Sequence, residues 1–376
     1  MVEIRKVTTK KEKRIFASYI LKLYKDNPNA VPKLFMDEMD NFNPKKNPSY
    51  EFCDVVQYLA YKDGTCVGRI AGIYHKKSNE KWNENSIRFT RVDFIDDIEV
   101  STALFNAIET WGLSLGADKI AGPQGFTDFD QQGMLIEGFE YPSNYITIHN
   151  YSYYVDHMIR LGYVKDVDWV EYRLNILSSL EDKLYHLADS VQRRSKVHLK
   201  EFTSMRKLGP YLLQIMDLVH ESYKDLHGVV ELNEKQISQY ITQLKLVLNP
   251  EYVKLVFDES EKLVAFGFGM PSFNNALQKS NGHLFPFGWL RILLASRKKG
   301  SVLDLYLVGV SDNYRTKGLP AILLSAMQRT AKKNGVPYAE TGPELETNTH
   351  VQALWKYFDS TNHIRRRCWK KSINES

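Results

Sequence analysis

The chain has 376 residues, of which 43% are hydrophobic and 25% charged, a composition typical of a globular protein with room for two domains. Its net charge of +5 comes from 50 basic and 45 acidic residues, and so small an excess gives no nucleic-acid footprint. Three scattered cysteines indicate neither a disulfide framework nor a zinc site. With no signal-peptide core and no apolar run long enough to span a bilayer, we expect a cytoplasmic protein.

The first half of the sequence predicts alternating strands and helices. In chain order we expect a strand over residues 2–7, a helix after Thr9, a proline-containing loop over 27–50, a hairpin of strands 55–61 and 66–74, a strand over 87–94, a helix over 100–115, a strand over 119–121, a helix over 153–161 and a strand over 170–174.

The same order returns in the second half. We expect a strand over residues 197–202, helices over 208–223 and 234–248, a hairpin of strands 252–257 and 263–270, a strand from Val302, a helix from Leu319, a strand ending near Gly342, a helix over 351–358 and a strand over 364–369. Such self-similarity predicts an internal duplication, with domains over 1–176 and 196–376 and a helical connector over 177–195.

The turn between the strand from Val302 and the following helix is the strongest site signal. Its sequence, Asn313-Tyr314-Arg315-Thr316-Lys317-Gly318, joins a buried strand to a helix N-terminus, where free N–H groups and the helix dipole attract anions. Arg315 and Lys317 add charge, and Gly318 permits a close approach to the backbone. Neither a G-x-G-x-x-G nor a P-loop pattern is present, so a different phosphate ligand is indicated.

Arg315-Thr316-Lys317-Gly318 resembles the [QR]-x-x-G turn of the GNAT acyltransferases, although Pro320 stands where that family usually has Gly or Ala. The repeated order of elements is also that of a GNAT domain and covers nearly the whole chain. The segments LFMDEMDNFNPKKNPSYEF, GPQGFTDFDQQGMLIEGFE and TGPELETN further resemble a group of bacterial proteins built from tandem GNAT domains. The resemblance implies an α/β (α+β) fold with two mixed, mostly antiparallel sheets flanked by helices.

The resemblance also implies a cofactor, acetyl-CoA or another acyl-CoA. It assigns the pantetheine arm to the strand backbone at Val308, Gly309 and Val310, and the pyrophosphate to the turn and helix start at Arg315, Thr316, Lys317, Gly318, Leu319 and Pro320. The matching turn of the first half, Ile95 to Glu99, has three acids and no glycine and would repel a pyrophosphate. We therefore expect the first half to be degenerate.

Acyl transfer to an amine needs a general base and an acid for the leaving thiolate. Glu344 and Glu346 are candidate bases beside the expected thioester, and Asn348 could orient the pantetheine, but these side chains could instead cap the next helix. Many GNAT enzymes have a tyrosine seven residues after this asparagine, where this chain has Trp355. Tyr357, two residues later, is the remaining candidate acid.

These features predict an N-acetyltransferase acting on a small-molecule or peptide amine, with no metal and no nucleic acid. Two alternatives stay open, a tRNA-dependent aminoacyltransferase of the peptidoglycan type and a non-catalytic acyl-CoA-binding module. An acidic and aromatic region could line the acceptor site or form an ordinary surface loop; it comprises Asp128, Asp130, Gln131, Gln132, Glu137, Glu140, Tyr141, Tyr145, Tyr151, Tyr153 and Tyr154. Arg365, Arg366, Arg367, Lys370 and Lys371 are explained by salt bridges or a CoA phosphate.

An apolar insertion over residues 272–300 has no counterpart of similar length in the first half. Its large side chains, among them Phe285, Phe287 and Trp289, would be costly to leave in water. The insertion could pack over either half, line the mouth of an acyl site that accepts chains longer than acetyl, or rest on a membrane surface. Stable insertion into a bilayer is not expected.

Overall fold

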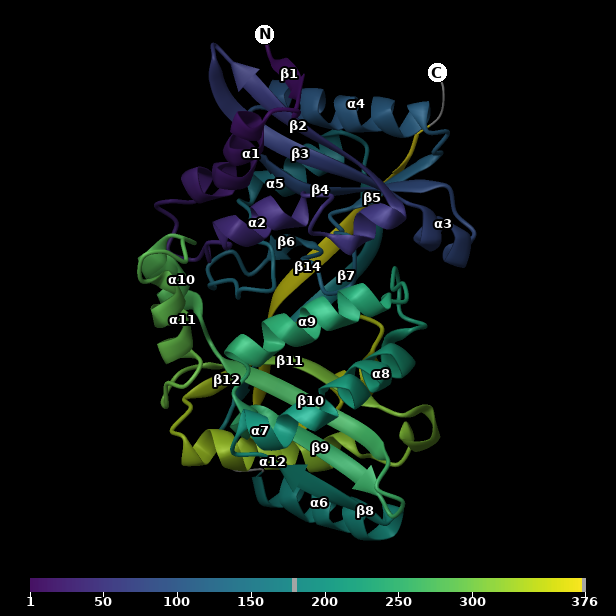
Figure 1. Ribbon diagram of the computed structural model, residues 1–376, viewed down its shortest axis with the longest axis vertical. Helices are drawn as coiled ribbons and strands as arrows, with labels where there is room; N and C mark the ends of the chain where they lie inside the picture. Colours follow the sequence, from purple (N-terminus) through teal and green to yellow (C-terminus); the bar gives the residue numbers. More distant parts are fainter. Residues whose placement is uncertain (178–180, 374–376) are drawn as a thin grey trace. The chain divides into compact units, whose positions relative to one another are not determined.

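The computed structural model describes residues 1–177 and 181–373 (Figure 1). They form two compact units, each drawing on both halves of the sequence. Unit 1 contains Met1–Trp169, Asn274–Trp289 and the residues from Ile364 on, and unit 2 contains Val170–Phe273 and Leu290–His363. The units differ from the stretches 1–176 and 196–376 by these exchanged segments.

The sheet of unit 1 has the strand order β1-β2-β3-β4-β5-β14. Its strands are β1 (Glu3–Lys6), β2 (Cys53–Lys62), β3 (Thr65–His75), β4 (Ser86–Phe94), β5 (Lys119–Gly122) and the part of β14 (Ser360–Ser372) from Ile364 on, with β6 (Met134–Glu137) paired to β14. All neighbours are antiparallel except β4 and β5, which are parallel. The last strand of the second half therefore completes the sheet of unit 1, where Trp369 pairs with Gly122.

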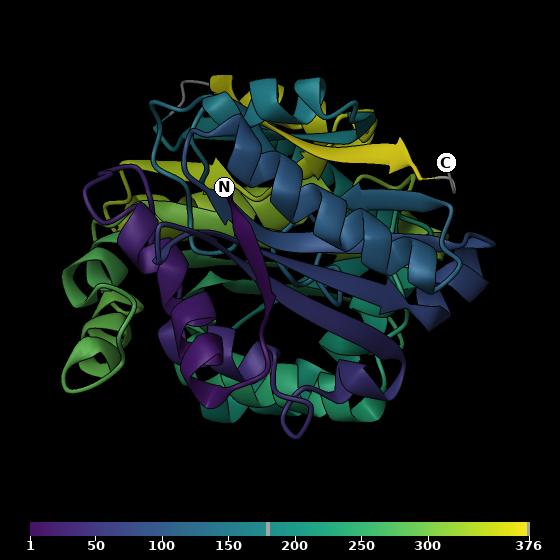
Figure 2. The ribbon, with the colours of Figure 1, turned by 90° about the horizontal axis from the view of Figure 1, so that it is seen from above.

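Helices cover both faces of this sheet, as Figure 2 shows for α4 and α1. The helices of unit 1 are α1 (Lys10–Leu23), α2 (Phe35–Asn41), α3 (Lys76–Trp82), α4 (Ile98–Ser114), α5 (Tyr153–Arg160) and α10 (Asn274–Ser280), with a 3-10 turn, η1, at Pro48–Glu51. Side chains alternate along β3 because successive residues face opposite sides of a strand. Gly72 lies so close to α4 that a Cβ would come within 2.7 Å of Trp111, whereas Arg69 reaches the carbonyl of Phe16 in α1.

The loop predicted over residues 27–50 is not without secondary structure. It contains α2 and η1, and the prediction was wrong there because four prolines dominated the local pattern. The short helix α3 follows the hairpin and was also not predicted. In contrast, α1 begins as expected after Thr9, whose side chain and that of Glu12 form a reciprocal capping box.

The sheet of unit 2 has the order β7-β12-β11-β10-β9-β8. Its strands are the part of β7 (Val164–Asn175) from Val170 on, β12 (Tyr338–Thr341), β11 (Leu303–Val310), β10 (Leu263–Pro271), β9 (Val253–Asp258) and β8 (Val197–Glu201), with β13 (Glu344–Leu345) paired to β7. Here β11 and β12 are the parallel pair. The last strand of the first half, β7, completes this sheet by pairing with β12.

Two layers of helices flank this sheet as well. The helices of unit 2 are α6 (Glu181–Ser195), α7 (Met205–Leu208), α8 (Leu212–Tyr223), α9 (Glu234–Val247), the part of α11 (Gly288–Ala295) from Leu290 on, α12 (Pro320–Lys333) and α13 (Thr349–Gln352), with 3-10 turns η2 (Gly209–Tyr211), η3 (Pro250–Tyr252), η4 (Asp312–Tyr314) and η5 (Trp355–Tyr357). Leu319 and Leu323 pack with Val191 of α6 in one apolar cluster. The helix predicted over 351–358 is split into α13 and η5, and residues 178–180 of the predicted connector lie outside the described residues.

Both units contain an opening between their parallel strands. Pairing of β4 with β5 runs only from Ser86 to Arg88, and pairing of β11 with β12 only from Leu303 to Leu305. A register shift follows on the other edge of each strand, opposite Arg69 in β3 and opposite Phe268 in β10. The two mixed, mostly antiparallel sheets flanked by helices confirm the predicted fold class.

Candidate functional site

The turn that precedes α12 combines a left-handed glycine with two exposed basic side chains at a helix N-terminus. Gly318 has φ +81°, a conformation that glycine adopts without strain, and it leads directly into the helix. The N-cap residue is Leu319, whose apolar side chain cannot cap the first N–H groups of the helix. Arg315 and Lys317 are exposed beside it, the former 2.7 Å from Asp312 and the latter over the ring of Tyr314. Because Pro320 has no N–H group, the turn offers one donor fewer than a Gly or Ala would provide.

The matching turn of unit 1 is closed by its own side chains. Asp97 caps α4 by accepting a hydrogen bond from the backbone of Glu99. Lys62 lies 2.6 Å from the Asp97 carboxylate and 3.4 Å from that of Glu99, and Asp96 contacts the ring of His157 at 3.1 Å. Three carboxylates at the start of a helix repel a phosphate.

The strand opening of unit 1 is also filled. The hydroxyl of Tyr154 accepts a hydrogen bond from the N–H of Phe94, and the hydroxyl of Tyr153 donates one to the carbonyl of the same residue. The rings of Phe94 and Tyr154 stack with their centres 4.2 Å apart, and Tyr24 donates to the Tyr154 hydroxyl at 3.0 Å. The end of β4 therefore has aromatic partners at the place where a pantetheine arm would lie.

In unit 2 the end of β11 is partly covered by α8. The Tyr223 hydroxyl donates to the carbonyl of Val308 at 2.9 Å, and the Ser222 hydroxyl donates to that of Val310 at 3.2 Å. Gly309 is required for close packing, because a Cβ there would lie 2.2 Å from the Phe266 ring. Two of the three strand residues predicted to hold pantetheine thus already have a side-chain partner for their carbonyl groups.

Two acids lie side by side in the short stretch where β11 and β12 are paired. Asp304 of β11 and Glu340 of β12 are register partners, and the charges of Glu340 and Glu171 add to the effect of burial on the pKa of Asp304. Burial raises the pKa of Asp304 to about 8, although Ser272 donates a hydrogen bond to its carboxyl group. Its Oδ2 and the hydroxyl of Tyr306, two residues later, have no hydrogen-bond partner among the described residues. A buried carboxyl group with one oxygen left without a hydrogen bond and a raised pKa is a candidate for a functional site.

Glu344 follows shortly after β12. Its carboxylate accepts a hydrogen bond from the indole N–H of Trp355 at 3.0 Å. Burial raises the pKa of Glu344 to about 8, and the neighbouring Glu171 acts in the same direction. The residue that replaces the expected tyrosine is therefore a hydrogen-bond partner of a candidate base.

The other residues predicted near the thioester have structural contacts. Asn348 is the N-cap of α13, so its side chain is used in the capping role that the sequence left open. The Glu346 side chain is half-buried in the turn before it, and Gln352 donates to the carbonyl of Glu346. Tyr357 is half-buried in η5 and packs on the apolar core of unit 2. None of these contacts places the Tyr357 hydroxyl beside Asp304.

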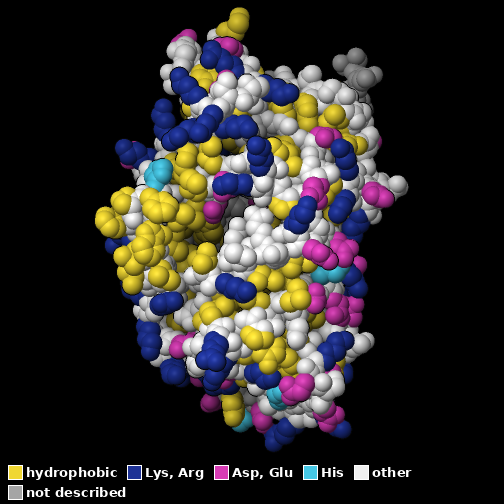
Figure 3. Space-filling model, in the orientation of Figure 1, with side chains coloured by type: hydrophobic (Ala, Val, Ile, Leu, Met, Phe, Trp, Pro, Cys, Tyr) yellow, Lys and Arg dark blue, Asp and Glu magenta, His cyan; other side chains and the backbone are white. Residues whose placement is uncertain are grey.

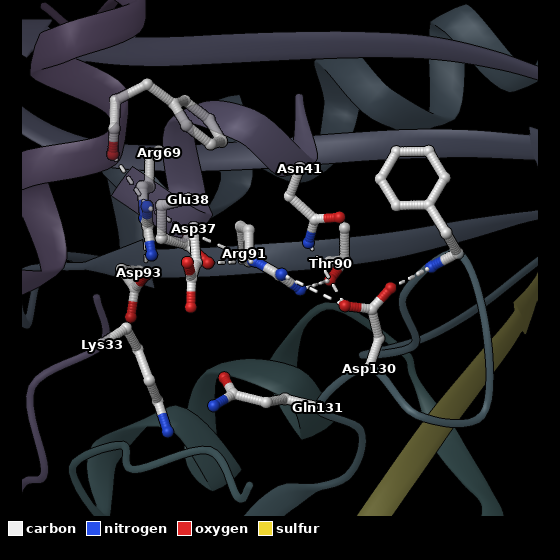
Figure 4. A network of polar contacts seen from close by, with 12 residues as sticks. Lys33, Asp37, Glu38, Asn41, Arg69, Thr90, Arg91, Asp93, Asp130 and Gln131 are labelled. Atoms are coloured by element: carbon white, nitrogen blue, oxygen red, sulfur yellow. Dashed lines mark hydrogen bonds and ion pairs between the residues drawn. The ribbon is translucent and has the colours of Figure 1, made fainter. Parts of the chain in front are cut away.

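Unit 1 contains a second polar cluster, a buried ionic network that Figure 4 shows. Arg69 binds Asp93 at 2.7 Å and Glu38 at 3.2 Å, and Arg91 binds Glu38 at 3.0 Å and Asp130 at 3.4 Å. Burial alone would raise the pKa of Glu38, but Arg91 and Arg69 outweigh it and lower that pKa. The residues come from α2, β3, β4 and the loop before β6, so the network joins four segments.

Lys33 lies beside this network and is buried. Its ammonium group donates to the carbonyls of Tyr145 at 2.7 Å and Thr147 at 2.6 Å, and burial lowers the pKa of Lys33 well below its usual range. Lys33 and His149 line a cavity of about 280 Å³ between the end of α1 and α10. Burial also lowers the pKa of His149 to about 4, so the ring is neutral near pH 7.

The acidic and aromatic region predicted to line an acceptor site has divided roles. Asp130 belongs to the ionic network, Gln131 donates to the carbonyl of Tyr145, and Tyr151 stacks on Tyr153.

On β14, four of the five basic residues form salt bridges, which is one of the two explanations that the sequence allowed. Arg365 and Arg367 bind Asp168, Lys370 binds Asp166 and Lys371 binds Glu109.

Sequence reasoning missed the residues with the most unusual surroundings. These are Lys33, Glu38, Arg69, Arg91, Asp93, His149, Asp304 and Tyr306. One signal was available, since Arg69 and Asp304 each interrupt an otherwise apolar strand, in VGRIAGI and VLDLYL.

In the parts of the chain that the structure describes, no cluster of three or more His, Cys, Asp or Glu residues is arranged to hold a metal ion. Across the same residues, every helix is too short or too polar to cross a membrane.

Two curated proteins are similar to the chain over nearly its whole length. It is 28% identical over 378 residues to Protein YghO of Escherichia coli (strain K12), covering 98% of this chain and 95% of that protein. It is 25% identical over 381 residues to a Caulobacter vibrioides protein named bacterial ceramide synthase, covering 98% and 96%. No family model matches the sequence.

Solved structures resemble the fold across both units. A tandem GNAT protein from the clavulanic acid biosynthesis pathway matches with a TM-score of 0.57, 11% identity and 100% of both chains covered. A GCN5-related N-acetyltransferase from Sphaerobacter thermophilus matches with a TM-score of 0.51 and 11% identity, covering 100% of this chain and 96% of that one. At such identities the likeness concerns the fold, and the chain has the tandem fold of the GCN5-related N-acetyltransferases.

Proposed function

We propose that this protein is an acyl-CoA-dependent N-acyltransferase whose donor binds in unit 2. One observation carries the proposal: β11 and β12 separate beside Asp304, a buried carboxyl group whose Oδ2 has no partner among the described residues. The glycine turn before α12 lies at the far end of the same strand, β11, as an extended cofactor would require. Unit 1 differs in both respects, since its turn is acidic and its opening is filled by tyrosines.

In this proposal the pyrophosphate of the cofactor binds the turn of Arg315, Thr316, Lys317 and Gly318 at the start of α12. Helix N-termini with basic neighbours are suited to phosphate groups. The pantetheine arm then follows β11 past Val308 towards Asp304, and the Tyr223 hydroxyl must leave the Val308 carbonyl if that group binds the arm. The proposal covers acetyl and longer acyl groups, and acetyl-CoA is the simplest donor to test.

Asp304 is the proposed general base, with Glu344 as the second candidate. In the reaction the amine nitrogen attacks the thioester carbonyl carbon, the amine proton passes to the carboxylate, and the carbon–sulfur bond breaks. The leaving thiolate takes a proton and departs as the thiol. Tyr306, whose hydroxyl is buried without a partner among the described residues, is placed closer in sequence to the base than Tyr357 and is the proposed acid.

The acceptor is proposed to be the amine of an amphiphilic molecule. The support is the name of the Caulobacter relative, bacterial ceramide synthase, because a ceramide is an amide of a long-chain amine. At 25% identity this similarity suggests the class of acceptor and leaves the individual compound open. Peptide and other small-molecule amines belong in the same screen.

A thiol-release assay tests the proposal. Purified protein is incubated with acetyl-, octanoyl- or palmitoyl-CoA and a panel of amines, and the free CoA thiol is measured together with a thermal shift for each donor. Stabilisation by a donor and amine-dependent thiol release are expected for at least one pair. If no acyl-CoA raises the melting temperature, the assignment of the cofactor is wrong.

A non-catalytic acyl-CoA-binding module is the second candidate. It is favoured by the use of Asn348 as a helix cap and by Trp355 at the position of the usual tyrosine. Stabilisation by acyl-CoA without thiol release, for every amine in the panel, would select this candidate. Acylated product identified by mass spectrometry would reject it.

A further inference from the structure

Residues 284–299, hereafter the docking segment, present large apolar side chains to the solvent. Phe285 is 76% exposed, Phe287 64% and Leu294 63%, and Trp289 and Leu290 are exposed beside them. Figure 3 shows hydrophobic side chains gathered over α10 and α11. Only Ile292 of the large residues in α11 is buried, so this helix shows most of its apolar surface to water. Contiguous exposed patches of this kind mark interaction sites.

The docking segment follows α10, which is anchored by hydrogen bonds to other parts of unit 1. Gln278 of α10 donates to the carbonyls of Pro28 and Ala30, and Asn274 donates to that of Ser143. The N–H of Phe35 binds the carbonyl of Gly282 at 2.9 Å, where an added Cβ would lie 2.1 Å from the Lys33 carbonyl oxygen. The exposed aromatic residues therefore follow directly on a part of unit 1, α10 and Gly282, that is held by hydrogen bonds and close packing.

The region around the docking segment carries only positive charge. Between Leu263 and Leu303 the sequence has no acidic residue and five basic ones, namely Lys279, Arg291, Arg297, Lys298 and Lys299. The other 45 basic residues of the chain equal its 45 acidic residues in number, so this region accounts for the whole net charge of +5. Arg297, Lys298 and Lys299 are exposed directly after α11.

We propose that the docking segment binds the surface of an anionic phospholipid bilayer. Trp and Phe side chains favour the boundary between headgroups and acyl chains, and clustered Lys and Arg side chains are attracted to anionic headgroups. A short helix with apolar side chains beside a basic run provides both contributions at once. A protein partner would need acidic groups to match five positive charges, and a second copy of the same basic segment would repel the first.

This binding does not depend on catalysis, and its test does not use the enzymatic reaction. The full chain is centrifuged with vesicles of phosphatidylcholine alone or mixed with phosphatidylglycerol, at low and high salt. We expect binding to the anionic vesicles, weakened at least tenfold in the triple variant Phe285→Ser, Phe287→Ser, Trp289→Ser. The triple variant Arg297→Gln, Lys298→Gln, Lys299→Gln should reduce binding and its dependence on salt.

Two matched controls separate this segment from the general surface. Leu246→Ser removes a side chain of α9 that is 72% exposed, and Lys6→Gln, Lys10→Gln, Lys11→Gln removes three other exposed charges; both should bind as the wild type does. Circular dichroism establishes that each variant is folded. Equal vesicle binding of the wild type and the aromatic variant overturns the proposal. A dimer in light scattering that the aromatic variant loses, without vesicle binding, would also overturn it and assign the face to self-association.

Discussion

Asp304 and Glu340 stand side by side on parallel strands, yet only Glu340 has an ion-pair partner, Arg173. Glu340 contacts the guanidinium of Arg173 at 2.7 Å and the ring of His363 at 3.0 Å, whereas Asp304 receives one hydrogen bond from Ser272. Two carboxyl groups in one register position are thereby made chemically different. The group without a charged partner is the one whose proton can move during a reaction.

Asp304 should make the folded protein less stable as the pH rises. Its pKa is about 8 in the folded chain against 3.8 for the ordinary side chain, so the folded state binds the extra proton between about pH 4 and pH 8. Stability falls through that window by about 1.4 kcal/mol for each pKa unit at most. Asp304→Asn should therefore melt progressively higher than the wild type between pH 5 and pH 8.5. A constant difference in melting temperature across that range would contradict this.

If Asp304 is the general base, activity should rise with pH and level off above about pH 8. Asp304→Asn should lower kcat by roughly two to four powers of ten and abolish this rise, with little change in acyl-CoA affinity. Glu344→Gln is the matched control, since it removes a second acid whose pKa is also raised to about 8. If the rise of activity with pH is lost in the Glu344 variant and kept in the Asp304 variant, Glu344 is the general base and Asp304 is not.

Gly318→Val should weaken CoA binding by roughly 10- to 100-fold, the value of one charge-assisted hydrogen bond to the pyrophosphate. The Cβ would make an ordinary 3.4 Å contact with Val191, so the main local cost is the positive φ of +81°. Gly335→Val is a close control, because Gly335 has φ +68° at the other end of the same helix with open space around it. Calorimetry that finds equal CoA affinities in the two variants would remove the cofactor from this turn.

Tyr223→Phe should strengthen acyl-CoA binding. It removes the hydroxyl that now binds the Val308 carbonyl, which leaves the carbonyl available to a pantetheine N–H group. A hydrogen bond with a net value of about 0.5 to 1.5 kcal/mol predicts roughly two- to tenfold tighter binding. Ser222→Ala tests the neighbouring contact to Val310 in the same way. Weaker binding in the Tyr223 variant would mean that its hydroxyl itself contacts the cofactor.

Arg69→Ala should destabilise the protein by roughly 3 to 5 kcal/mol, because it leaves the buried carboxylates of Glu38 and Asp93 without a shared partner. Urea unfolding measures the loss directly. Arg5→Ala provides the contrast, since Arg5 pairs with Glu3 on the exposed surface and its removal should leave stability unchanged. Similar midpoints for both variants would show that the network around Arg69 is not a stabilising element.

Much of the fold could be predicted because its signals are local. The hairpin turn, the Thr9 cap and the glycine turn at Gly318 depend on residues within a few positions of one another. The repeated order of elements then indicated two related domains. In contrast, α2 could not be predicted because the prolines around it favour a loop. This helix is stabilised by tertiary contacts, such as the hydrogen bond from Arg69 to Glu38, 31 residues away.

The candidate site was harder to predict for the same reason. Asp304 is recognisable as an acid in an apolar strand, but its lack of a charged partner depends on where Arg173 lies in the fold. Asn348 has the sequence position of a cofactor ligand, and only the start of α13 gives it the role of a cap. Charge patterns in a sequence name the ionisable groups, whereas their pairing is set by the fold.

The pairing of Trp369 with Gly122 joins residues that are far apart along the chain and has a consequence for biosynthesis. The sheet of unit 1 stays one strand short until residues 364–372 have left the ribosome, although β1 to β5 emerge early. Until then the edge of β5 is open, and unpaired strand edges are prone to association. Such distant contacts also raise the contact order and slow folding. The nascent chain is therefore expected to depend on chaperones for longer than a protein built of two sequentially folding domains.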